Sequence, residues 1–209
     1  MGRDVELACR CGQVHGWLRG ATPRAVNRVV CYCDDCQAFL HHLGRAELLD
    51  AHGGSDIVQV APAAMAFDRG TANIVALRFS PRGPYRFYAK CCKTPLGNTV
   101  RPSMPFVGCV TELFKGAPDE AARAASFGPP VGAIFGKFAI GQVDGAADKM
   151  GLGVLARAFR CIVGWKLGGK TWPHPYFERG ATEPRYPVTL LSRDERESAR
   201  ARSGPSPRA

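Results

Sequence analysis

Seven of the nine cysteines in this 209-residue chain fall into three short groups. The groups are Cys9 and Cys11, then Cys31, Cys33 and Cys36, then Cys91 and Cys92. Cysteines two residues apart rarely reach a relaxed disulfide geometry, whereas both thiolates can turn toward one metal ion from a tight loop. Sites made only of thiolates favour zinc over magnesium or calcium. The sequence therefore predicts zinc as the cofactor, with one or two ions per chain.

The middle group has the spacing Cys-x-Cys-x-x-Cys and offers three thiolates, from Cys31, Cys33 and Cys36. A structural zinc site is closed by four protein ligands, whereas a catalytic site keeps one position for water or substrate. The spacing therefore predicts a catalytic zinc with an open position. Three thiolates leave the site with net negative charge, which suits it to holding a thiolate and requires a nearby cation. Arg10 and Lys93 are the expected cations.

The order of the three groups resembles the glutathione-dependent formaldehyde-activating enzyme family (Gfa), whose relatives include centromere protein V. The resemblance covers roughly residues 7–109 and rests on the motifs at 9–12, 31–36 and 91–97. It implies a zinc-binding β-tent fold and a carbon–sulfur lyase that acts on an aldehyde adduct of glutathione or another small thiol. It also implies a catalytic zinc on the middle group and a structural zinc on the outer groups, held by Cys9, Cys11, Cys91 and Cys92.

Two positions depart from the family pattern. Ala89 stands where the family has the first cysteine of a Cys-x-x-Cys pair, and Cys91 is the candidate replacement. Cys91 either joins the outer cysteines, which we favour, or closes the middle group into a structural tetrad; a single zinc or another metal is a third arrangement. Tyr32 replaces a common histidine, which leaves substrate recognition open. The alternative function is therefore a non-catalytic, zinc-stabilised binding module for a protein or nucleic-acid partner.

Four further side chains are candidate site residues. His41 and His42 follow the middle group within two helical turns, so either could supply a fourth ligand or move a proton. The simpler interpretation for each is a solvated or core histidine. Cys109 and Cys161 have no partner at ligand spacing, and we expect both to be buried as small hydrophobic residues.

The elements that must position these residues are short strands, which makes the predicted fold class mainly β. Residues 1–115 form the expected zinc-binding β domain, with strands near 13–18, 25–30, 73–79, 85–88 and 106–110. A short helix through 36–40, capped by Asp34 or Asp35, would hold the third cysteine of the middle group near the first two.

A helical and irregular extension over 116–191 is expected to pack on this domain, followed by a disordered tail over 192–209. The extension includes predicted helices at 118–126 and 148–167. Five apolar residues share one face of the second helix: Leu152, Leu155, Phe159, Ile162 and Val163. We expect this face to pack on the β domain or on a second copy, so the 148–167 helix is the candidate surface for a homo-oligomer.

Composition narrows the classes of partner. The net charge is +10, but the basic residues are scattered and form no block interleaved with aromatics, so nucleic acid is not expected. A small anionic thiol such as glutathione would suit the positive charge. No apolar run approaches the roughly 18 residues of a membrane span, and the first ten residues do not read as a secretory signal. We therefore expect a cytoplasmic protein with no membrane span.

Overall fold

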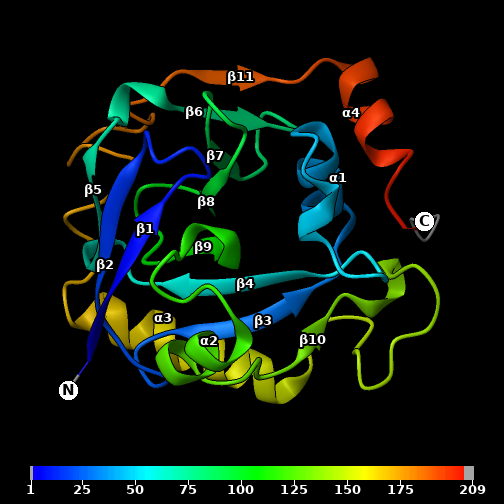
Figure 1. The fold of residues 1–209 in the computed structure, drawn as a ribbon, viewed down its shortest axis with the longest axis horizontal. Coiled ribbons are helices and arrows are strands. Elements are labelled where there is room, and N and C mark those ends of the chain that lie inside the picture. Colours follow the sequence, from blue (N-terminus) through cyan, green and yellow to red (C-terminus); the bar gives the residue numbers. More distant parts are fainter. Residues whose placement is uncertain (1, 205–209) are drawn as a thin grey trace.

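Two β-sheets dominate the computed structural model, which describes residues 2–204 (Figure 1). The three-stranded sheet has the order β1 (Arg3–Ala8), β2 (His15–Ala21) and β5 (Met65–Arg69). The eight-stranded sheet has the order β10 (Ala133–Ile134), β3 (Asn27–Cys31), β4 (Ser55–Val60), β9 (Val107–Val110), β8 (Pro95–Thr99), β7 (Tyr85–Ala89), β6 (Ile74–Arg78) and β11 (Val188–Leu190). Neighbouring strands are antiparallel except the two edge pairs, β10 with β3 and β11 with β6. The predicted mainly β class is confirmed.

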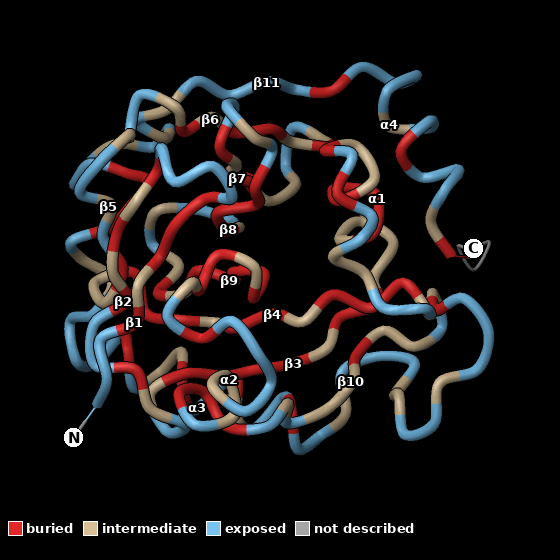
Figure 2. Tube along the Cα trace, viewed as in Figure 1, coloured by how far each residue is buried: buried red, intermediate tan, exposed pale blue. Residues whose placement is uncertain are grey.

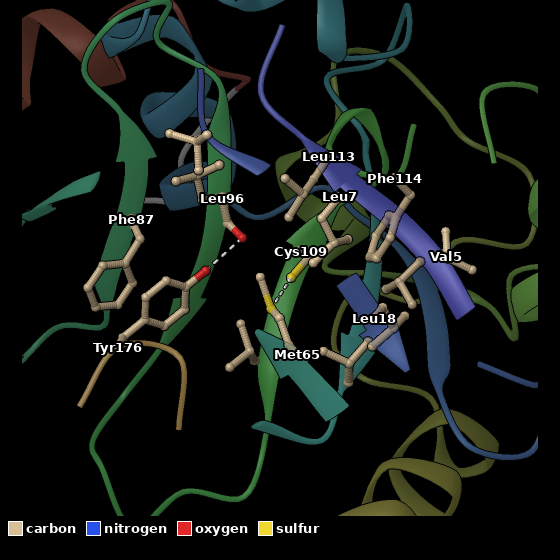
Figure 3. Close-up of a cluster of buried hydrophobic side chains, with 14 of the residues drawn as sticks. Val5, Leu7, Leu18, Met65, Phe87, Leu96, Cys109, Leu113, Phe114 and Tyr176 are labelled. Carbon is tan, nitrogen blue, oxygen red and sulfur yellow. Dashed lines mark hydrogen bonds between the residues drawn. The ribbon is translucent and has the colours of Figure 1, made fainter. Parts of the chain in front are cut away.

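Buried side chains from both sheets meet in one main core (Figure 3). Phe87 of β7 stacks on Tyr176, with ring centroids 3.7 Å apart and planes within 4° of parallel. The Tyr176 hydroxyl donates a hydrogen bond of 2.8 Å to the backbone carbonyl of Leu96. Because Tyr176 and Phe177 are fully buried, they fasten the part of the chain that follows α3 onto the sheets.

Four α-helices surround the sheets: α1 (Asp34–His42), α2 (Glu120–Phe127), α3 (Leu152–Leu167) and α4 (Arg193–Arg200). Short 3-10 turns lie at Ala46–Leu48, Pro62–Ala64, Thr71–Asn73, Thr111–Leu113 and Gly136–Phe138. The cap predicted for α1 is wrong, because the N-cap residue is Cys33 and no side chain caps the helix. Asp34 and Asp35 lie instead in the first turn, where carboxylates favour the positive end of the helix dipole.

The apolar face predicted for α3 does not pack on the β domain and is largely exposed in the single chain. The buried residues of the helix are Val154, Ala158, Cys161 and Trp165, whereas Leu152 is 85% exposed and Phe159 is 67% exposed (Figure 2). Both faces of this helix are apolar, so periodicity alone does not select one of them. The buried face carries the smaller side chains Val154, Ala158 and Cys161, which allow the helix to approach the sheet closely.

The C-terminal end also differs from the expected disordered tail over 192–209. Residues 193–200 form α4, which begins with a capping box between Ser192 and Glu195. Ala199 is buried against the cluster that includes Phe39 and Leu40 of α1, so contacts with α1 outweigh the highly charged composition of this segment. Residues 205–209 lie outside the described part of the chain. Among the described helices, none is long and apolar enough to cross a bilayer.

Candidate metal centres

The first centre, here called the four-cysteine cluster, contains Cys9, Cys11, Cys91 and Cys92. The first two lie in the turn between β1 and β2, and the last two lie in the turn between β7 and β8. All four Sγ atoms lie within 4.8 Å of one another. Cys91 is 3.4 Å from Cys11 and 3.9 Å from Cys9, measured between Sγ atoms. The structure therefore places Cys91 with the outer cysteine groups and could hold a metal ion there.

Two tight turns aim these thiols at one point. Gly12 has a φ of 74°, a left-handed conformation that glycine adopts without the strain a Cβ would bring. The Val14 N–H beyond it donates to Cys9 Sγ at 3.2 Å. In the second turn Lys93 has a φ of 57°, and the Ala89 N–H donates to the Thr94 carbonyl at 2.9 Å. Because Cys91 lies in a turn rather than in a strand, it and its neighbour can face the same side.

A hydroxyl group supports the last thiol of this cluster. Thr94 Oγ1 lies 3.2 Å from Cys92 Sγ and accepts a hydrogen bond of 2.9 Å from the Arg10 N–H. Burial raises the pKa of Cys92, but hydrogen bonds from Thr94 and Cys11 outweigh burial and lower that pKa to about 6. A metal binds thiolate rather than thiol, so one ligand is ready for a metal at neutral pH.

The second centre, here called the three-cysteine cluster, contains Cys31, Cys33 and Cys36, whose Sγ atoms lie within 4.8 Å of one another. Cys31 ends β3, Cys33 is the N-cap residue of α1, and Cys36 lies in its first turn. The strand-to-helix junction expected from the sequence thus brings the three thiols together. In the described part of the chain, no histidine or carboxylate joins either cluster.

Arg86 of β7 is the cation that faces the three-cysteine cluster, and the sequence analysis missed it. It is 4% exposed, and its Nη1 lies 3.9 Å from Cys36 Sγ. The other two thiols and this guanidinium lower the pKa of Cys36 well below its usual range. A lone arginine within the otherwise apolar strand Tyr-Arg-Phe-Tyr was the available signal, because a buried charge needs a partner.

The remaining sequence candidates lie elsewhere. Arg10 lies by the four-cysteine cluster, where its N–H contacts Thr94, and the Lys93 ammonium lies 5.3 Å from the centre of the Tyr88 ring. The Tyr32 hydroxyl donates to Asp50 at 2.9 Å, so its role in the fold is structural. His41 and His42 belong to neither cluster, and burial lowers the pKa of both. Cys109 and Cys161 are buried outside both clusters.

Two hollows differ in their relation to these thiols. A cavity of about 10 Å³ is lined by the polar or ionisable residues Cys36, Ser55, Arg86 and Asn98 and by apolar residues from α1 and the eight-stranded sheet. It holds about one water molecule. An open hollow of about 430 Å³ is lined by Arg28, Asp56 and other charged residues but by none of the clustered cysteines. The cavity beside Cys36 is therefore small, and neither Cys31 nor Cys33 lines it.

A family model matches most of this chain. Residues 1–185 match the family model described as a family of unknown function, DUF6151. The matched span contains both cysteine clusters and ends before α4. The search of curated proteins found no match for this chain.

Proposed function

The chain belongs to DUF6151, a family of unknown function, and we propose that it is a zinc-dependent carbon–sulfur lyase acting on an aldehyde adduct of a small thiol such as glutathione. A zinc ion on Cys9, Cys11, Cys91 and Cys92 is structural in this proposal. A second zinc ion on Cys31, Cys33 and Cys36 carries the chemistry. The fold is then a β-tent of the kind found in the Gfa family, which the cysteine order resembles.

Sulfur spacing in the four-cysteine cluster supports zinc there. Two thiolates at about 2.3 Å from one tetrahedral ion lie about 3.8 Å apart. The separations are 3.6 Å for Cys9 and Cys11, 3.9 Å for Cys9 and Cys91, 3.8 Å for Cys91 and Cys92, and a shorter 3.4 Å for Cys11 and Cys91. A thiol set without oxygen ligands also favours zinc over magnesium or calcium.

The single observation that carries the enzyme proposal is that one cluster contains four cysteines and the other contains three. Because Cys91 lies with Cys9 and Cys11, it is not available to the three-cysteine cluster. Three protein ligands are typical of a catalytic zinc, which keeps one position for substrate, whereas four are typical of a structural one.

The proposed reaction involves no net oxidation. In the cleavage direction the carbon–sulfur bond breaks, its electron pair stays on sulfur, and the hydroxyl loses its proton as the carbonyl forms. When bound, zinc supplies a Lewis acid that stabilises the departing thiolate. Cys31, Cys33 and Cys36 hold that ion, and the guanidinium of Arg86 offsets negative charge beside Cys36. The released thiolate then takes up one proton.

Exchange spectroscopy tests this proposal. Formaldehyde labelled with ¹³C is mixed with glutathione, and NMR measures how fast free aldehyde and the S-hydroxymethyl adduct interconvert. The zinc-loaded protein should accelerate the exchange above the buffer rate, and Cys33→Ser should return it to that rate while one zinc ion per chain is kept. Cys161→Ser is the matched control and should behave as wild type. No acceleration with glutathione, cysteine or another small thiol by protein holding two zinc ions would exclude the lyase.

One observation favours a second candidate function, the zinc-stabilised binding module. Leu152, Phe159 and Leu167 of α3 are all more than half exposed, which is unusual for large apolar side chains on one helix. A protein partner would cover them. Loss of a co-purified protein on substitution of Phe159 by Ser, with wild-type zinc content, would support the module.

A further inference from the structure

Arg86 is a buried arginine whose hydrogen-bonding capacity is largely unused. Its Nη2 lies 3.5 Å from Asp35 Oδ2 and its Nη1 lies 3.9 Å from Cys36 Sγ. N–H···O hydrogen bonds are about 2.7–3.2 Å long, so the contact with Asp35 is a long one. Its Nε has no hydrogen-bond partner among the described residues.

Arg28 of β3 shows what a saturated buried arginine looks like in the same protein. It is 2% exposed, and its guanidinium makes three hydrogen bonds to Asp56, at 2.6, 2.9 and 3.3 Å. It makes two more to Glu120, at 2.5 and 3.0 Å. An N–H left without an acceptor in the interior destabilises the fold. A purely structural Arg86 would be expected to resemble Arg28, so its free N–H points to a ligand.

The surroundings of Arg86 limit what that ligand can be. The guanidinium carbon lies 5.5 Å from the ring centre of Phe39 and 5.6 Å from that of Phe79. Arg86 and Cys36 both line the cavity of about 10 Å³, together with Asn98. The free space is about one water molecule, so only a small group fits there beside Arg86 and Cys36.

With a metal ion on the three-cysteine cluster, the charges around that space nearly balance. A divalent ion on three thiolates leaves one net negative charge, which Arg86 offsets. The neighbouring carboxylate of Asp35 is already paired with Arg200, at 2.6 Å. An added anion therefore meets a local site that is close to neutral.

We propose that Arg86 and the metal position of the three-cysteine cluster form one site for a small monoanion, with the anion between the metal and the guanidinium. The class is a monatomic or linear anion such as chloride or azide, which would place one atom in the cavity. This inference rests on the second metal ion of the proposed function. It goes beyond that function because it assigns anion selection to a residue outside the cysteine motifs.

Cobalt substitution tests the site without measuring turnover. The full chain is loaded with Co²⁺, the metal content is measured, and the visible bands are followed during titration with sodium azide at constant ionic strength. The wild-type bands should change and saturate. Arg86→Met should weaken the apparent azide affinity by at least about tenfold, because a charge-assisted hydrogen bond is lost. Benzenesulfonate, which is too large for the cavity, should leave the bands unchanged.

Two more variants keep the result interpretable. Arg78→Met removes a half-buried arginine of β6 that stacks on Tyr85 and should bind azide as wild type does. Arg86→Lys retains a charge without the planar fork and should bind azide more weakly than wild type, which provides the test if Arg86→Met does not fold. The proposal would be overturned if a folded Arg86 variant bound azide with unaltered affinity. It would also be overturned if azide did not change the visible bands of the wild-type protein.

The outcomes also separate this proposal from the lyase. A chain that binds one cobalt ion, unchanged by Cys33→Ser, lacks the second metal site, and both ideas fail. If azide binding depends on Arg86 but the protein turns over no thiol adduct, the lyase proposal is contradicted and the anion site is supported.

Discussion

The Sγ atoms of Cys11 and Cys91 lie 3.4 Å apart although 80 positions separate the residues in the chain. Their contact joins the β1–β2 turn to the β7–β8 turn, and so links the two sheets at one edge of the core. A metal ion held there would cross-link distant segments. Its loss should therefore reduce the stability of the whole fold rather than of one loop.

Cys91→Ser should release the metal ion of the four-cysteine cluster. Loss of a residue that only hydrogen-bonds a metal ligand weakens metal binding by about 10–100-fold. Loss of a ligand itself should therefore weaken it by more than about 100-fold. Competition with a chromogenic chelator measures the affinity, and thermal unfolding should show a lower midpoint.

The assignment of Cys91 is decided by comparison with two other variants. Cys91→Ser should match Cys9→Ser in metal content and stability, and it should differ from Cys36→Ser. If the double variant Cys36→Ser/Cys91→Ser loses no more metal than Cys36→Ser alone, Cys91 belongs to the three-cysteine cluster instead. Cys161→Ser, outside both clusters, serves as the control.

The buried Arg28 should be held by two carboxylates acting together. Asp56 is 23% exposed and Glu120 is 65% exposed at the side chain. Glu120→Gln alone should lower the free energy of unfolding by less than about 1 kcal/mol, because Asp56 still compensates the charge. Asp56→Asn/Glu120→Gln should cost about 3–5 kcal/mol, since it leaves a buried charge unpaired.

Urea unfolding of the two single variants and the double variant measures these costs and their coupling. Arg28→Met in the double-variant background should recover part of the stability, because the uncompensated charge is gone. Additive costs for the two carboxylates would contradict the shared role.

Much of the candidate site was predictable from sequence because its cysteines lie close together along the chain. Cys31, Cys33 and Cys36 lie within six residues, and a strand-to-helix junction brings such neighbours together regardless of the rest of the fold. The mainly β class was predictable for a similar reason, since short apolar strands separated by glycine and proline are read one at a time.

Arg86 and the packing of α3 depend on contacts between distant segments. Arg86 reaches Cys36 across 50 positions, and no local pattern specifies which strand lies beside α1. The buried face of α3 depends on which of two apolar faces fits the sheet, as Val154 and Ala158 show. In α4 the charged composition suggested disorder, but Arg200 pairs with Asp35 at 2.6 Å.

Gln37 is a second residue whose role only the tertiary structure reveals. It is fully buried, and its amide donates to the carbonyls of Tyr32 and Phe138, at 2.6 and 2.9 Å. Its oxygen accepts from the Gly204 N–H at 2.8 Å. Gln37→Leu leaves three polar groups without partners and should lower the free energy of unfolding by about 2–4 kcal/mol.

Hydrogen exchange gives a local readout for this variant. The amide of Gly204 should exchange faster in Gln37→Leu, whereas Gln13→Leu, at an exposed glutamine, should leave that rate unchanged. Wild-type protection at Gly204 in a folded Gln37→Leu protein would contradict the role assigned to this side chain.

His174 should make stability fall in mild acid. Burial, followed by the nearby Arg185, lowers the pKa of His174 from 6.5 to about 4. Its Nδ1 accepts the Tyr176 N–H at 3.1 Å, so a proton on Nδ1 would break that bond. Between pH 6.5 and 4 the unfolded chain binds a proton that the folded chain excludes. The free energy of unfolding therefore decreases as the pH falls through this window, by roughly 3 kcal/mol in total, and is fully retained above it.

His174→Asn isolates this contribution, because the asparagine oxygen can accept the same N–H without titrating. Urea unfolding at several pH values, with zinc held at saturation, compares the variant with wild type. The free energy of unfolding of wild type minus that of the variant should decrease as the pH falls from 6.5 to 4, since only wild type loses stability through this histidine. Acid release of zinc affects both proteins equally and cancels in the difference. Parallel pH profiles for the two proteins would show that His174 takes up its proton as readily in the folded chain as in the unfolded one.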